Sequence, residues 1–147
     1  MRITNVLWLF AIFSLTACAQ TPLKEEIPLI RVPIGIGYMI ADVSCDEVKN
    51  TSIPKRLEEL EIAFEWSDED DSLLTVGPMT EDAESGSVYL KIRQTYFLTI
   101  VCRDEVTTKI DGEVALEGLN SDGEWIGIID VPIVEQYGKQ FLESLEL

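Results

Sequence analysis

Cysteines and carboxylates are the side chains of this sequence that could take part in catalysis, metal binding or covalent modification. There are three cysteines, Cys18, Cys45 and Cys102, and 27 acidic residues against 11 basic ones, so the formal net charge is −16. The chain has no histidine, which excludes Ser-His-Asp and Cys-His catalysis and imidazole metal sites. Proteins that bind the phosphates of nucleic acids need clustered lysine and arginine, so the acidity excludes that class.

Neither the acidic residues nor the serines complete a known catalytic or metal-binding motif. The acidic run at 68–71 fails the EF-hand pattern, because Leu73 and Met79 stand where glycine and glutamate are needed. Ser52 and Lys55 have the S-x-x-K spacing of penicillin-binding proteins, but the companion motifs S-D-N and K-T-G are absent. We therefore predict no enzyme, no cofactor and no metal. A two-carboxylate glycosidase stays open, since only the spacing in the fold decides it.

The first 17 residues have the composition of a secretory signal peptide. A short segment containing Arg2 precedes an unbroken apolar stretch at 6–13, and small residues follow up to Cys18. This stretch is shorter than the about 20 residues that a membrane-spanning helix needs. We predict a signal peptide over residues 1–17, a proline-containing tether over 18–33, and a single domain over 34–147.

Leu15, Thr16, Ala17 and Cys18 resemble the lipobox of bacterial lipoproteins, in which leucine, a small or hydroxylated residue and glycine or alanine precede the cysteine. The resemblance implies that Cys18 carries a diacylglyceryl group and is the first residue of the mature chain, with an amine that is often acylated. Lipid chains bind a bilayer with about 0.8 kcal/mol per buried CH₂. The residue after the cysteine is Ala19 and not aspartate. In lipoproteins of two-membrane bacteria, such a residue implies the periplasmic face of the outer membrane. The alternative is an ordinary signal peptide with a chance cysteine.

Cys45 and Cys102 are the two cysteines of the expected domain. In an exported chain they favour one disulfide, and loop closure of this length would contribute about 4 kcal/mol in the chain-entropy model. The alternative is a pair of buried free thiols, since cysteine packs well as a small apolar residue.

Alternation of apolar and polar residues predicts an antiparallel sheet. The clearest strand spans residues 88–103, and residues 107–119 continue the alternation after a turn. A hairpin within 62–79, an earlier strand within 34–45 and a short strand at 125–129 would complete about 4–5 strands.

Two helices are expected on one face of this sheet, giving a two-layer α+β domain. The first is a short helix over residues 53–61, preceded by a turn and capped by Ser52; the alternative is a longer helix from Asp46, kinked at Pro54. The last begins after Asp130 and carries one apolar stripe at helical spacing, which consists of Val134, Tyr137, Gly138, Phe141 and Leu145.

The order of these elements over residues 36–145 resembles the C-terminal domains of the BamC lipoproteins, accessories of the machinery that assembles outer-membrane β-barrels. A strand, a helix, a hairpin across 64–76, a long strand pair across 89–119 and a closing helix carry the resemblance. The LptE lipoproteins of lipopolysaccharide transport have a comparable order. The resemblance implies an accessory protein of the cell envelope.

Phe97 and Val101 are apolar residues on the outward face of the longest strand, which otherwise carries Lys91, Arg93, Thr95, Thr99 and Arg103. They indicate either a patch that binds a partner or the surface on which the tether packs. We favour the tether slightly.

We predict a non-enzymatic lipoprotein, anchored through the lipid on Cys18, that binds or scaffolds another envelope protein. The alternative is a carrier of a small apolar or cationic ligand, held on the concave sheet face under the helices. An exposed apolar patch would favour the first function, an internal cavity the second, and two convergent carboxylates with raised pKa values an enzyme.

Overall fold

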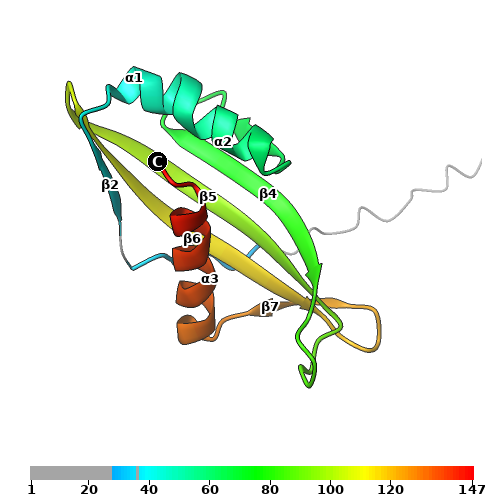
Figure 1. Ribbon diagram of the computed structural model, residues 1–147. Coiled ribbons are helices and arrows are strands. Elements are labelled where there is room, and N and C mark those ends of the chain that lie inside the picture. The colour runs from blue at the N-terminus through cyan, green and yellow to red at the C-terminus, as the bar shows by residue number, and fades with distance from the viewer. Residues whose placement is uncertain (1–27, 36) are drawn as a thin grey trace, which may run out of the picture.

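The chain folds into a sheet covered on one face by helices (Figure 1). The computed structural model describes residues 28–35 and 37–147. The strands are β1 (Val32–Pro33), β2 (Tyr38–Ala41), β3 (Phe64–Trp66), β4 (Leu73–Asp82), β5 (Lys91–Asp104), β6 (Thr107–Leu119) and β7 (Trp125–Ile128). The helical segments are α1 (Cys45–Glu47), the π-helical turn η1 (Val48–Ser52), α2 (Ile53–Glu59) and α3 (Val131–Ser144). This architecture confirms the α+β class.

The sheet has seven strands rather than the expected 4–5, because one edge of β6 is shared by three short strands. The strand order is β1-β6-β5-β4-β3, and β2 and β7 also pair with β6. β2 lies beside the beginning of β6, β1 beside its middle and β7 beside its end. All these pairs are antiparallel. Val32 and Pro33, which the sequence places at the end of the tether, thus belong to the sheet.

β5 and β6 form the longest ladder, from Lys91 opposite Leu119 to Asp104 opposite Thr107. The alternation predicted for β5 is confirmed, because the residues on its inward face are buried: Ile92, Gln94, Tyr96, Leu98 and Ile100. From β6 the core receives Ile110, Val114 and Leu116. These side chains fill the space between sheet and helices.

β4 is longer than predicted and has a partner on its outer side along only part of its length. It runs to Asp82 instead of ending at Met79. β3 pairs with residues Leu74 to Val76, and the register of β4 against β5 shifts between Val76 and Met79. The second half of β4 therefore forms the outer strand of the sheet (Figure 1).

The first helical segment differs from the expected short helix. Residues 45–59 are helical throughout, so the expected turn before residue 53 is replaced by η1, and the longer alternative is the one formed. The hydroxyl of Ser44 accepts a hydrogen bond from the Glu47 N–H over 3.2 Å, whereas Ser52 makes no capping hydrogen bond. The prediction of Ser52 as the cap is wrong. The π-helical turn changes the main-chain pairing just ahead of Pro54, which has no N–H to donate.

α3 begins where the sequence predicts. Asp130 caps it by accepting a hydrogen bond from the Ile133 N–H over 3.3 Å, and Pro132 stands in its first turn. The ring of Phe141 stacks on that of Tyr96 with centroids 3.9 Å apart, so the helix packs on β5. In the described part of the chain, neither α3 nor any other helix is long and apolar enough to span a membrane.

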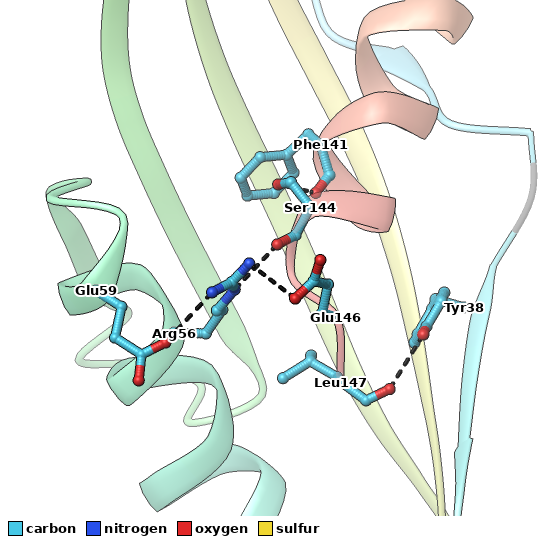
Figure 2. Close-up of polar contacts among 7 residues, drawn as sticks. All are labelled: Tyr38, Arg56, Glu59, Phe141, Ser144, Glu146 and Leu147. Atoms are coloured by element: carbon cyan, nitrogen blue, oxygen red, sulfur yellow. Dashed lines mark hydrogen bonds and ion pairs between the residues drawn. The ribbon is translucent and has the colours of Figure 1, made fainter.

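The segment after α3 is fastened between α2 and β2 (Figure 2). Arg56 donates from Nε to the main-chain oxygen of Ser144 over 3.0 Å, and its Nη2 lies 3.1 Å from the Glu146 carboxylate. The hydroxyl of Tyr38 donates to the main-chain oxygen of Leu147 over 3.0 Å. These contacts fix the position of α3 over the sheet.

Candidate functional site

Cys45 and Cys102 form the predicted disulfide. Their Cα atoms are 5.6 Å apart, and the bond joins the start of α1 to the end of β5. Cys45 is buried in the core and Cys102 is exposed. The disulfide thus fastens the first helical segment to the end of the β5–β6 hairpin.

Cys18, the predicted lipid attachment site, lies outside the described residues. The same holds for the predicted signal peptide over residues 1–17 and for residues 18–27 of the predicted tether. Residues 28–33 are described: residues 28–31 lead into β1, which is formed by Val32 and Pro33.

Phe97 is capped by a residue of the predicted tether. The guanidinium carbon of Arg31 lies 3.6 Å from the centroid of the Phe97 ring, which is a cation–π contact. Arg31 also lies 4.0 Å from the carboxylate of Glu113, the residue opposite Phe97 on β6. Val101 is half-buried further along β5. Arg31 of the predicted tether thus packs on Phe97, which is the arrangement expected if this surface binds the tether.

The face of the sheet away from the helices carries a second cation–π contact. Arg93 donates two hydrogen bonds to the Glu117 carboxylate, each over 2.7 Å, and its guanidinium lies 4.3 Å from the centre of the Trp125 ring. Arg93 and Glu117 stand directly opposite each other on β5 and β6, so they form a cross-strand charge pair. The arrangement joins three neighbouring strands, β5, β6 and β7.

A groove opens between the first half of α3 and the loop that joins β4 to β5. We call it the α3 groove; its volume is about 710 Å³. Ile92 and Ile128 belong to its lining, together with Val88 and Tyr89 of the loop and Ile133 of the helix. Val88 is 82% exposed and Ile133 is 43% exposed. The groove therefore presents apolar side chains to solvent from two separate segments.

A second hollow, here called the inner hollow, continues the α3 groove toward α2. Its volume is about 400 Å³, and it shares Glu81, Tyr137 and Gln140 with the α3 groove. Leu60, Ile62 and Met79 contribute apolar lining to it. The two hollows therefore adjoin at these three residues, beside β4.

Two tyrosines beside these hollows are held in the protonated state. Burial, followed by the charge of Glu81, raises the pKa of Tyr96 and of Tyr137. The hydroxyl of Tyr96 donates to Gln94 Oε1 over 2.6 Å. A phenol with a raised pKa acts as a hydrogen-bond donor and not as a base at neutral pH, which suits binding better than proton abstraction.

The charge of the α3 groove is negative. Its lining contains Glu81, Asp82 and Glu84 and includes no lysine or arginine among the described residues. Asp82 has a cation nearby, since Lys91 lies 3.7 Å from its carboxylate in an exposed pair. The described residues contain no group of three potential metal ligands.

A third hollow of about 580 Å³ lies between α3 and the chain around β2. Ile34, Tyr38 and Leu142 line it, and Glu135 and Glu143 stand beside them. Its size lies within the range of small-molecule sites.

The sequence contained only a partial signal for the α3 groove. The alternation predicts a strand from Val88, but β5 begins at Lys91 and Val88 lies in the exposed loop before it. The exposure of Val88 and Ile133 depends on how this loop and α3 meet. No protein-family model matches this chain, and no curated protein matches it. The function must therefore be argued from the residues themselves.

Proposed function

We propose that this protein is a lipid-anchored, non-enzymatic subunit of the bacterial envelope that binds another envelope protein through its α3 groove. The anchor would be the lipid on Cys18, and the domain would face the periplasm from the outer membrane. The BamC-like order of elements is consistent with such an accessory role.

The anchor argument rests on the lipobox residues that end at Cys18. Pro28, the first described residue, lies ten positions after Cys18. An extended chain spans about 3.5 Å per residue, so the described domain would begin within about 35 Å of the lipid. Such a reach suits a partner that is itself in or on the membrane.

The observation that carries the binding proposal is the exposed apolar rim of the α3 groove. Two segments supply it, the β4–β5 loop and the stretch from β7 into α3, which lie at the same end of the domain (Figure 1). Val88 and Ile133 are the exposed apolar residues of its lining. The same two segments also carry the exposed residues Leu90, Ile126, Ile129 and Val131. Contiguous apolar surface rimmed by polar residues is typical of protein interaction sites.

The test is affinity isolation of the full-length protein from mildly solubilised envelopes, followed by mass spectrometry. We expect a stoichiometric envelope protein that is retained by the wild type and lost with Ile133→Ser. The matched control is Met39→Ser, which removes an exposed apolar side chain from β2. Equal recovery with both variants would contradict binding through the groove.

A small-ligand carrier is the second candidate, favoured by the hollow between α3 and the chain around β2. Its lining is mainly apolar, which suits an apolar molecule. Of its charged residues, Glu143 lies 3.8 Å from Lys139, and Glu135 would contact a cationic group. Native mass spectrometry of the purified domain is the test. The carrier proposal would replace the first one if a bound metabolite is found, if Leu142→Trp releases it, and if no protein partner is isolated.

A further inference from the structure

We propose that the free edge of β4 binds a basic, extended segment of a partner protein by strand addition. The inference rests on the proposed binding function and names the chemistry of the partner. It concerns the outer edge of β4 and the two hollows beside it.

The first observation is an open row of main-chain groups. On the outer side of β4, the last contact with the preceding segment is the hydrogen bond from the Gly77 N–H to the Ala63 oxygen, 2.8 Å long. Beyond it, no described strand pairs with β4 on that side. Thr80, Glu81 and Asp82 are all exposed.

The direction of these groups follows from the ladder between β4 and β5. Ala83 donates its N–H to the Leu90 oxygen over 3.0 Å, so the main-chain groups of Ala83 point toward β5. Main-chain groups alternate in direction along an antiparallel strand. Those of Glu81 therefore also point toward β5, and those of Thr80 and Asp82 point outward. Each offers one N–H donor and one C=O acceptor to a new strand.

The second observation is that this edge borders the hollows. Met79 and Glu81 share the inward face of the sheet with Gln94 and Ile92, the residues opposite them on β5. Both line the inner hollow, and Glu81 also lines the α3 groove. A strand beside β4 would direct alternate side chains to this face. Strand addition gains affinity from main-chain hydrogen bonds and specificity from such pockets.

The negative charge of the β4 edge indicates which kind of segment binds there. Glu81 and Asp82 stand on the edge itself and Glu84 follows, so a basic segment is attracted. A second copy of this chain, paired edge to edge, would bring the same carboxylates together. Like charges on an edge strand oppose such self-pairing, and Glu81 and Asp82 supply them here. The occupant is therefore a basic partner segment and not another copy.

The probe is a short peptide of alternating lysine and valine, with an alternating glutamate and valine peptide as its counterpart. Hydrogen exchange of the full-length protein measures where the peptide lies. We expect the basic peptide to protect the amides of Thr80 and Asp82, to bind more weakly as salt increases, and the acidic peptide not to bind. Binding that leaves these two amides unprotected, or no binding, would overturn the proposal. So would protection of both amides by dimerisation without peptide.

A charge-reversed variant makes the test independent of hydrogen exchange. Glu81→Lys with Asp82→Lys should weaken binding of the basic peptide at least about tenfold and allow the acidic peptide to bind. The matched control is Asp68→Lys with Glu69→Lys, which makes the same change in net charge at exposed positions of the β3–β4 loop. Equal weakening by both variants would mean that net charge alone drives binding, and would overturn edge recognition.

The failure of this inference can be told apart from the failure of the proposed function. If an envelope partner is lost with Ile133→Ser but retained by the Glu81→Lys and Asp82→Lys variant, the groove binds a protein without strand addition. If no envelope partner depends on Ile133 while the basic peptide still protects the edge, the inference survives and the partner-binding role of the groove does not.

Discussion

Arg56 and Ser144 lie 88 residues apart in the sequence, yet the Nε of Arg56 donates a hydrogen bond to the main-chain oxygen of Ser144 over 3.0 Å. Ser144 is the last residue of α3, where main-chain oxygens lack helical partners. A cation at this end also complements the helix dipole. The contact joins α2 to the end of α3, and Ser144 itself lines the inner hollow.

Replacement of Arg56 by alanine should lower the free energy of unfolding by about 1.5–3 kcal/mol, the usual range for a hydrogen bond to a charged group. Urea unfolding measures the change. Lys55→Ala is the control, because Lys55 is exposed and its ion pair with Glu59 is long, at 3.9 Å. That variant should change stability by less than about 0.5 kcal/mol. Equal losses in both variants would show that the Arg56 contact has no special role.

The disulfide should leave no free thiol on the purified domain. Intact-mass analysis after alkylation without reductant should show Cys45 and Cys102 unmodified, and two alkyl groups taken up there would contradict the bond. Reduction should cost about 2–4 kcal/mol of stability, because the unfolded chain regains conformational freedom. The Cys45→Ser and Cys102→Ser double variant should be equally stable with and without reductant.

Replacement of Cys18 by serine should abolish lipid labelling and release the protein from the membrane fraction, since the acyl chains would be lost. Metabolic labelling with a palmitate analogue and fractionation measure both effects. Cys102→Ser is the control, and it should keep the label. Membrane retention of the Cys18→Ser protein would contradict the lipobox interpretation.

Stability should decrease as pH rises above the ordinary tyrosine pKa of 10.0, because burial raises the pKa of Tyr96 in the folded state. Above pH 10 the unfolded chain loses this proton while the folded chain keeps it, so the folded state is disfavoured. Below that pH the contribution is constant. We expect Tyr96→Phe to lose less stability than the wild type between about pH 9 and about pH 11. Equal losses in urea unfolding would contradict this assignment.

The long ladder could be predicted from the sequence because its signal is local. Alternation over β5 and β6 places every second side chain on one face, and burial of Tyr96, Leu98 and Ile110 confirms it. The start of α3 was also predictable, since Asp130 and Pro132 are typical of a helix N-terminus.

Other features depend on contacts that local patterns do not contain. β1 has only two residues, and its pairing with β6 depends on how residues 28–33 approach the sheet. The helical continuity through Pro54 depends on a π-helical turn, which no propensity indicates. The α3 groove combines an acidic loop, which resembles any solvated loop, with the exposed side of a helix that was recognised only by its buried stripe.

The pairing of β1 with β6 also determines how the domain responds to mechanical load. A pull on the chain before Pro28 reaches the contact of Arg31 with Phe97 and then the two residue pairs of β1. The hydrogen bond from the Ile34 N–H to the Gly112 oxygen, 2.7 Å long, follows. If the Arg31 contact and the β1 pairs yield first, residues 28–33 add up to about 20 Å to the reach of the preceding chain. Ile34 is a buried core residue, so its hydrogen bond to Gly112 is the point at which further load begins to act on the core.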